Sequence, residues 1–224
     1  MIKAIIFDFD GTILDTESAE FKAWEDTYQA YGCELPFSMW AQVIGTANDM
    51  FNPITYLEQQ LGANIDRACV RRERRARLMQ LLEGQEIRPG VAQYMKEARR
   101  LQLKVGVASG SPRDWVGGHL ERLHLLPNIG AMRCADDVTR VKPAPDLYEA
   151  VLDDFGLNGA EAVAIEDSPN GALAAKRAGL YCVVVPNAMT EHLSFDHVGV
   201  DVQLDSLAEL PLNELLARLR RVYD

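Results

Sequence analysis

The sequence is poor in cysteine and histidine, the residues that build disulfide frameworks and zinc sites. Its 224 residues include four cysteines and four histidines. The cysteines are widely scattered without a paired spacing, which favours buried free thiols over disulfides. The histidines form two pairs with a spacing of five, but no cysteine pair lies nearby to complete a zinc site. These side chains are Cys33, Cys69, Cys134, Cys182, His119, His124, His192 and His197.

Long apolar runs are also lacking. No stretch approaches the roughly 20 apolar residues that a helix needs to cross a membrane. Met1 to Lys3 lead directly into an apolar segment that has the pattern of a core strand and not that of a targeting leader. We therefore expect a cytoplasmic protein without a membrane partner. No feature identifies a protein partner, and we expect a monomer while leaving oligomers open.

Positive charge is scarce. The chain has 23 Lys and Arg against 33 Asp and Glu, and this formal net charge of −10 argues against nucleic acid as a partner, because like charges repel. Hydrophobic residues make up 48% and charged residues 25%, so the chain is not disordered. Its length suffices for one large domain or two small ones with a buried core.

Two carboxylates follow an apolar run near the start of the chain. Ala4 to Phe7 read as a strand that is buried on both faces, and Asp8 and Asp10 follow it two residues apart, on the same side of an extended chain. Gly11 then permits a sharp turn. Both carboxylates should stand at the carboxyl end of the strand, where open α/β sheets bind ligands. Taken alone, the segment also fits a strand end with solvated turn carboxylates.

Three later segments add polar residues in similar surroundings. An apolar run over 104–108 leads into Ser109, and another over 162–165 leads into an acidic pair. Lys142 stands between them, ahead of two prolines. Each has an ordinary explanation on its own: a helix cap for Ser109, a surface position for Lys142, and a turn for the acidic pair. All of them in one chain, in this order, form a far more specific pattern. The acidic pair is Glu166 and Asp167.

This set of motifs resembles that of the haloacid-dehalogenase superfamily of phosphotransferases. The four motifs of that superfamily are Asp-x-Asp-x-Thr, a Ser or Thr closing the second strand, a Lys before a helix, and an acidic pair after a later strand. The resemblance covers essentially the whole chain. It implies a doubly wound parallel sheet, a Rossmann-like α/β core, with an inserted all-helical cap domain. The matching residues are Asp8, Asp10, Thr12, Ser109, Lys142, Glu166 and Asp167.

The resemblance also implies a role for each matching residue. Asp8 would attack phosphorus and form an aspartyl-phosphate, and Asp10 would protonate the leaving oxygen and then activate water. Ser109, with the backbone of Gly110, would bind phosphoryl oxygens, and Lys142 would hold Asp8 and the transferring group. The implied ligands of Mg²⁺ are Asp8, the backbone carbonyl of Asp10, Asp167 and, directly or through water, Glu166.

The charge count indicates the same cofactor. Up to four carboxylates would meet near one point, and two unit charges about 4 Å apart repel by roughly 4 kcal/mol at an effective dielectric constant of about 20. Lys142 offers one compensating charge. A hard dication would add two more and would find the oxygen ligands that it prefers, which suits Mg²⁺.

The hydrophobic periodicity divides the chain into two parts. A helical pattern without a buried strand extends over 17–83, whereas strands and helices alternate from Gly90 onward. Such alternation predicts a parallel sheet with helices on both faces. The first strand belongs with that sheet, so we expect an α/β core of residues 1–14 and 88–224 and an inserted helical domain over 15–87. The further strands are expected at 104–108, 131–134, 162–165 and 181–185.

The inserted part departs from the sugar-phosphate mutases of the superfamily. The chain is most similar to the branch that holds β-phosphoglucomutase and small-molecule phosphatases. In the mutases a cap His restrains hydrolysis of the phosphoenzyme, and an Arg of a later loop grips the distal phosphate. Glu20 stands where the His would be, and Asn48 stands near the Arg. Both departures favour a phosphatase, with Glu20 and Asn48 contacting the substrate. The five arginines within 71–77 are expected on a solvated helix face.

We therefore expect a Mg²⁺-dependent phosphatase that acts on a small phosphorylated metabolite, a sugar phosphate or a related monoester. An isomerase of the β-phosphoglucomutase type is the first alternative. A phosphoacceptor signalling domain is the second, because receiver domains also combine acidic residues, a Ser or Thr and a Lys on a doubly wound sheet. A receiver is shorter, however, and carries its acceptor Asp on a middle strand.

Overall fold

The chain forms two compact units. The computed structural model describes residues 1–41 and 51–221. One unit consists of Met1–Leu14 and Glu86–Asp224, and the other of Asp15–Gln85. The second boundary lies two residues before the one expected from the sequence. The roles of catalytic core for the first unit and cap for the second stay predictions.

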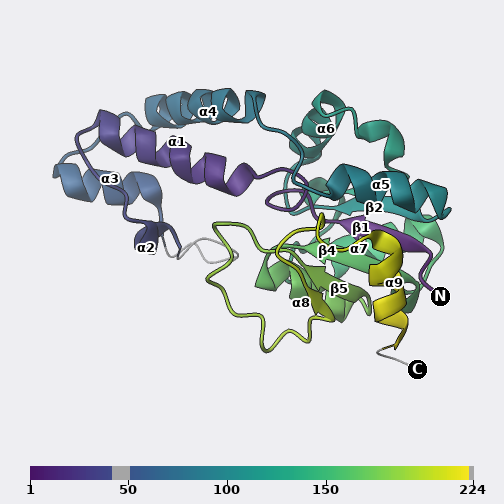
Figure 1. Cartoon of the computed structure of the whole chain (residues 1–224). Coiled ribbons are helices and arrows are strands. Elements are labelled where there is room, and N and C mark those ends of the chain that lie inside the picture. The colour runs from purple at the N-terminus through teal and green to yellow at the C-terminus, as the bar shows by residue number, and fades with distance from the viewer. Residues whose placement is uncertain (42–50, 222–224) are drawn as a thin grey trace. The chain divides into compact units, whose positions relative to one another are not determined.

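The first unit is built on a six-stranded sheet with the order β3-β2-β1-β4-β5-β6, in which all neighbouring strands are parallel (Figure 1). This confirms the predicted doubly wound α/β fold. The two-residue strand β6 was not predicted, because so short a segment carries no periodic signal. The strands are β1 (Ala4–Phe7), β2 (Lys104–Ala108), β3 (Ala131–Arg133), β4 (Ala162–Glu166), β5 (Tyr181–Val184) and β6 (Val202–Gln203).

Helices follow the strands of the first unit. The helix at the C-terminal end was missed by the sequence interpretation, although its buried leucines recur at the i, i+3, i+4 and i+7 positions of an amphipathic helix. These four leucines are Leu212, Leu215, Leu216 and Leu219. The helices are α5 (Val91–Arg100), α6 (Arg113–Arg122), α7 (Asp146–Phe155), α8 (Pro169–Arg177) and α9 (Leu212–Arg221). Short 3-10 turns occupy Leu126–Asn128, Ala135–Asp137 and Gly159–Glu161.

The regular elements among the described residues of the second unit are all helices. Local sequence fixes the helix starts: the Asp15 carboxylate accepts from the Ser18 N–H at 3.0 Å, and the Asn52 side chain accepts from the Thr55 N–H at 3.0 Å. Among all described residues, no helix has the length and apolar character that a membrane span requires. The helices are α1 (Thr16–Ala30), α2 (Phe37–Trp40), α3 (Pro53–Leu61) and α4 (Arg67–Glu83).

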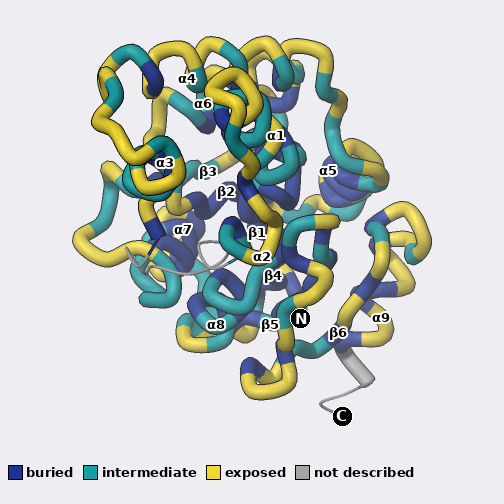
Figure 2. The backbone as a smooth tube through the Cα atoms, turned by 90° about the vertical axis from the view of Figure 1, so that its left-hand side faces the viewer, coloured by how far each residue is buried: buried dark blue, intermediate teal, exposed yellow. Residues whose placement is uncertain are grey.

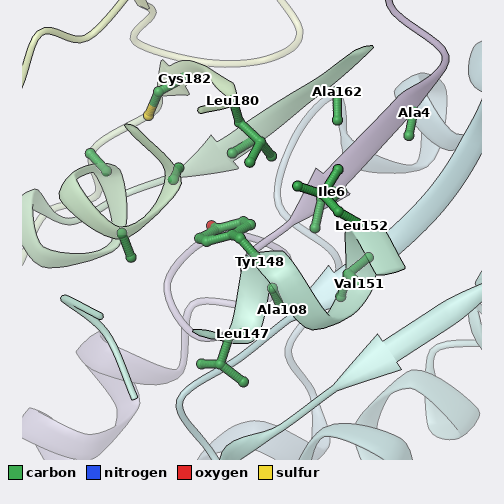
Figure 3. Packing of buried hydrophobic residues seen from close by; sticks show 14 of the residues in the cluster. Ala4, Ile6, Ala108, Leu147, Tyr148, Val151, Leu152, Ala162, Leu180 and Cys182 are labelled. Atoms are coloured by element: carbon green, nitrogen blue, oxygen red, sulfur yellow. The ribbon is translucent and has the colours of Figure 1, made fainter. Parts of the chain in front are cut away.

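A hydrophobic cluster lies between one face of the sheet and helices α7 and α8 (Figure 3). Ala4 and Ile6 of β1 point into this cluster, and the alternation of side chains along a strand directs Ile5 and Phe7 to the other face. All four are fully buried, and β1 is dark blue in Figure 2. A strand that is covered on both faces is a continuous apolar run in sequence, which is why β1 could be predicted.

All four cysteines are free thiols. Cys134 and Cys182 are buried, as expected, whereas Cys33 and Cys69 of the helical unit are only half-buried. The prediction of free thiols is therefore confirmed, and the prediction that all of them are buried is wrong for the two in the helical unit, whose small core covers less of each side chain.

Two glycines of the first unit should respond to alanine in opposite ways. A Cβ on Gly106 of β2 would stand 2.7 Å from Val151 Cγ1 and 3.1 Å from Phe155 Cε2, both on α7. Gly106→Ala should therefore lower the free energy of unfolding by about 1–3 kcal/mol, as overpacked cores do. A Cβ on Gly118 in α6 would meet no atom within 4 Å apart from its chain neighbours and the backbone of its own helix. Gly118→Ala should raise the free energy of unfolding by about 0.5–1 kcal/mol through helix propensity.

Urea unfolding followed by circular dichroism measures both changes. A Gly106→Ala protein at least as stable as the parent would contradict the close packing of α7 on β2.

Candidate active site

Three neighbouring strands bring the sequence motifs to one edge of the sheet. β1 pairs in parallel with β2 on one side and with β4 on the other. Asp8 follows the last residue of β1 and Ser109 follows that of β2, while Glu166 ends β4 and Asp167 comes next. The carboxyl ends of parallel strands meet at one edge, so these residues become neighbours although they lie far apart in sequence.

Lys142 bridges the ends of β1 and β4. Its ammonium group contacts Asp8 Oδ1 and lies 2.7 Å from Glu166 Oε1. The three side chains are between 0% and 10% exposed. The same ammonium lies 5.3 Å from the centroid of the Tyr148 ring. The structure thus brings Asp8, Lys142 and Glu166 together, and the alternative of an ordinary surface lysine is wrong.

Glu166 accepts two further hydrogen bonds from its surroundings. The Tyr148 hydroxyl donates to Glu166 Oε1 at 2.5 Å, and the Asp167 N–H donates to Oε2 at 3.3 Å. Gly171 of α8 leaves the space for this carboxylate, since a Cβ there would lie 1.9–2.2 Å from its atoms. Tyr148 belongs to the hydrophobic cluster of Figure 3, so the ring packs in the core while the hydroxyl reaches the site.

Asp167 is held from two loops. Thr12, which follows β1, donates its hydroxyl to Asp167 Oδ1 over 3.5 Å, and Asn187, which follows β5, donates to Asp167 Oδ2 at 2.7 Å. Gly11 has a φ of +76°, and a Cβ on it would stand 2.3 Å from Asp167 Oδ2. Glycine is therefore required here both for the turn and for the approach of the carboxylate.

The Asp10 side chain is directed toward the loop after β2 and helix α6. Asp10 Oδ2 accepts from the Ser111 hydroxyl at 2.6 Å and from the Ser109 hydroxyl at 3.4 Å, and Asp10 Oδ1 accepts from Trp115 Nε1 at 2.8 Å. Ser109 is fully buried, and its oxygen also accepts from the Ser111 N–H at 3.1 Å. Gly110 lies beside them and is exposed. Ser111 and Trp115 are contacts of Asp10 that the sequence interpretation did not identify.

Burial dominates the electrostatics of Asp8. It raises the pKa of the Asp8 carboxyl to about 7, although the Lys142 ammonium opposes the change and the Glu166 and Asp10 carboxylates add to it. Burial alone would lower the pKa of Lys142, but the Asp8 and Glu166 carboxylates raise it above its ordinary value. The lysine therefore stays protonated, and the carboxyl groups around it outnumber it.

Three carboxylates form a group that could hold a metal ion. Asp8, Glu166 and Asp167 each offer an oxygen, and these oxygens lie within 4.8 Å of one another. All three residues are buried. Such an all-oxygen set fits a hard cation of the Mg²⁺ type. The fourth predicted ligand, the backbone carbonyl of Asp10, stays a prediction, and the Asp10 side chain contacts Trp115.

Two residues of the helical unit, Glu20 and Asn48, were predicted to contact the substrate, and this contact stays a prediction. Glu20 of α1 forms a pair with Arg74 of α4, whose Nη1 lies 2.5 and 2.6 Å from the two carboxylate oxygens. The Arg74 side chain is 18% exposed and its guanidinium lies 5.3 Å from the centroid of the Trp24 ring. Arg74 therefore departs from the expectation that the whole arginine run is solvated, because Glu20 and Trp24 draw it inward. Asn48 lies outside the described residues.

Comparisons with known proteins place the chain in one family. The haloacid dehalogenase-like hydrolases match residues 2–179. "Putative phosphatase YhcW" of Bacillus subtilis (strain 168) is 45% identical over 219 residues, which are 98% of each chain. Hexitol phosphatase B of Escherichia coli (strain K12) is 29% identical over 96% of this chain and 97% of its own.

A solved structure extends the similarity to the fold. The D10N mutant of CbbY from Rhodobacter sphaeroides, in complex with xylulose-(1,5)bisphosphate, superposes with a TM-score of 0.76 at 30% identity. The match covers 96% of this chain and 99% of the CbbY chain. The family match over residues 2–179 and these relatives agree with the motif resemblance found in the sequence. The chain therefore belongs to the haloacid dehalogenase-like hydrolase family, in a branch whose members include phosphatases.

Proposed function

We propose that the chain is a Mg²⁺-dependent phosphatase that hydrolyses a small phosphorylated metabolite through a phosphoenzyme on Asp8. The observation that supports this most strongly is the contact of one buried lysine, Lys142, with both Asp8 and Glu166. Structural lysines are rarely buried between carboxylates, because desolvation of the charges costs more than most ion pairs return. Phosphoryl transfer to a carboxylate is favoured by this arrangement, since an anionic nucleophile has to attack a dianion next to positive charge.

Asp8 is the nucleophile in this proposal. Its carboxylate attacks phosphorus, the bond to the substrate oxygen breaks, and hydrolysis of the resulting acyl phosphate regenerates the carboxylate. Burial raises the pKa of Asp8 to about 7 even with Lys142 in contact. Lys142 alone thus leaves a fraction of Asp8 protonated at neutral pH, and further positive charge would favour the reactive, ionised form.

Asp8, Glu166 and Asp167 would hold Mg²⁺. Their buried oxygens lie close enough together to share one ion. The chemistry that bound Mg²⁺ supplies is neutralisation of charge on the phosphate oxygens and on the carboxylates around them. Lys142 then fixes the positions of Asp8 and Glu166 relative to each other, and the Tyr148 hydroxyl donates a further hydrogen bond to the Glu166 carboxylate.

Asp10 is the general acid and base in this proposal. It protonates the leaving oxygen in the first step and accepts the proton of the attacking water in the second. Its contacts to Ser109, Ser111 and Trp115 place its carboxylate beside the hydroxyl that would bind a phosphoryl oxygen. Ser109 and the backbone N–H of Gly110 bind those oxygens in this proposal.

The substrate is proposed to be a sugar phosphate or a related monoester. The similarity to hexitol phosphatase B and to CbbY in complex with xylulose-(1,5)bisphosphate supports a phosphorylated carbohydrate. Glu20 replaces the His that restrains hydrolysis in the mutases, and its carboxylate is engaged with Arg74. Hydrolysis of the phosphoenzyme should therefore be unrestrained. The cytoplasmic location and the monomeric state stay predictions.

Asp8→Asn should abolish turnover. The amide keeps the shape of the side chain but removes the attacking charge, so phosphate release from an aryl phosphate should fall by at least about a thousandfold. Circular dichroism should show an intact fold. More than a tenth of the parent activity, in protein purified free of contaminating phosphatase, would contradict the assignment of Asp8.

Asp10→Asn is the companion variant. It removes the proton donor but not the nucleophile, so a substrate with a good leaving group should suffer less than one with a poor leaving group. Release of nitrophenol from p-nitrophenyl phosphate in the first turnover should therefore exceed release of the alcohol from an alkyl phosphate. An equal loss for both esters would argue against the acid role.

Metal removal should stop the reaction. Excess chelator should abolish phosphate release, and Mg²⁺ should restore it, because one lysine cannot balance three buried carboxylates and a phosphate. Ca²⁺ should restore it poorly, since its larger and looser coordination sphere disturbs in-line geometry. Asp167→Ala should lose activity and regain part of it at high Mg²⁺. Full activity in excess chelator would refute the metal-assisted mechanism.

The isomerase alternative is tested with β-glucose 1-phosphate, Mg²⁺ and a catalytic amount of glucose 1,6-bisphosphate. We expect free phosphate to dominate over glucose 6-phosphate, because no cap His restrains attack by water. Both products can be followed by coupled enzymatic assays. Efficient isomerisation with little phosphate release would replace the phosphatase by the isomerase. If neither product forms but other phosphate esters are hydrolysed, only β-glucose 1-phosphate is excluded as a substrate.

A further inference from the structure

A buried asparagine, Asn187, lies next to the proposed metal ligand Asp167. Asn187 follows β5 and is 7% exposed. It was not among the residues predicted from the sequence. It does not extend the carboxylate group, since an amide nitrogen is no ligand for Mg²⁺. Its position next to Asp167 therefore needs another explanation.

The orientation of the Asn187 amide is fixed by its own turn. Asn187 Oδ1 accepts from the Met189 N–H at 2.8 Å and from the Thr190 N–H at 3.2 Å. Backbone N–H groups need an acceptor, so the oxygen must face the turn and the nitrogen must face the site. The Asn187 Nδ2 then donates to Asp167 Oδ2 at 2.7 Å and to the Gly11 carbonyl at 3.3 Å.

The surroundings leave Asp167 little freedom to turn. The position of a Cβ on Gly11 is 2.3 Å from Asp167 Oδ2 and 2.6 Å from Asn187 Nδ2, so the three groups are packed without a gap. Arg88 fixes the same backbone, because its guanidinium donates to the Gly11 carbonyl and, at 3.1 Å, to the Val185 carbonyl. The Asn187 amide, which donates to Asp167 Oδ2, is thus held in place by the surrounding backbone.

We propose that Asn187 is a positioning residue that holds the Asp167 carboxylate in the orientation needed to bind Mg²⁺. The proposal rests on the metal site of the proposed function. A carboxylate that must first be turned and ordered binds a cation more weakly than one that is already held, and loss of such an outer partner typically weakens metal binding by about 10- to 100-fold.

A purely structural role for Asn187 would be to close the turn that follows β5. The turn has a further bond that can be removed separately: the Asn187 N–H donates to Thr190 Oγ1 at 3.0 Å. Thr190→Val deletes this bond, keeps the shape of the side chain and leaves the Asn187 amide in place. Asn187→Ser does the reverse, because a serine hydroxyl can still accept from the turn but is too short to reach Asp167.

The experiment compares Mg²⁺ binding by the parent, Asn187→Ser and Thr190→Val proteins without substrate, by isothermal titration calorimetry. We expect Asn187→Ser to raise the dissociation constant for Mg²⁺ by about 10- to 100-fold and Thr190→Val to leave it within about twofold. Turnover should follow the same pattern, with more Mg²⁺ needed for half-activation of Asn187→Ser and most of the maximal rate regained at saturation. Circular dichroism checks that both variants fold.

Three results would overturn the proposal. Parent-like Mg²⁺ binding by Asn187→Ser would remove the positioning role and leave the proposed function intact. Equal weakening by Thr190→Val would show that the turn, and not the bond to Asp167, controls the site. A parent protein that binds no Mg²⁺ and keeps its activity in chelator would instead remove the metal from the proposed function, and the role of Asn187 with it.

Discussion

The contact of Lys142 with Asp8 and Glu166 is the interaction on which the rest of the candidate site depends. Three charges at the edge of a parallel sheet are nearly or fully buried. Such charges are tolerated only when their remaining polar atoms find partners, because an unpaired buried charge costs several kcal/mol. The carboxylates outnumber the ammonium, and burial raises the pKa of Asp8. Additional positive charge, such as that of a bound cation, would therefore stabilise the ionised carboxylates of the site.

The core supplies the partners that this ion cluster needs. Tyr148 packs its ring among the apolar side chains of α7 and α8 and gives its hydroxyl to Glu166. Gly171 of α8 yields the space that the same carboxylate occupies. Packing and chemistry are thus coupled: a shift of α7 or α8 on the sheet would move a hydrogen-bond donor or a wall of the site. Interiors packed at crystal density transmit such shifts instead of absorbing them.

The sequence predicted the fold and the motif residues because both carry local signals. A buried parallel strand is an apolar run, and polar residues directly after it stand at the carboxyl edge, so Asp8 and Glu166 could be expected to meet. Tyr148 and Asn187 carry no such signal, since one resembles a core aromatic and the other a turn former. Ser111 precedes a proline, a pattern typical of helix caps, yet its hydroxyl bonds Asp10. Their partners are set by the register of distant strands.

The charge of the whole chain and the charge of the site act over different distances. A net charge of −10 repels a long polyanion, because such a partner would contact an extended part of the protein surface. A small phosphate monoester meets only its own site, because salt screens exposed charges beyond about 8 Å at physiological ionic strength. In the proposed function, Lys142, the Ser109 hydroxyl and a cation bound by the three buried carboxylates would then decide its binding. The proposed phosphatase would therefore be able to bind a phosphorylated metabolite although its net charge disfavours nucleic acid.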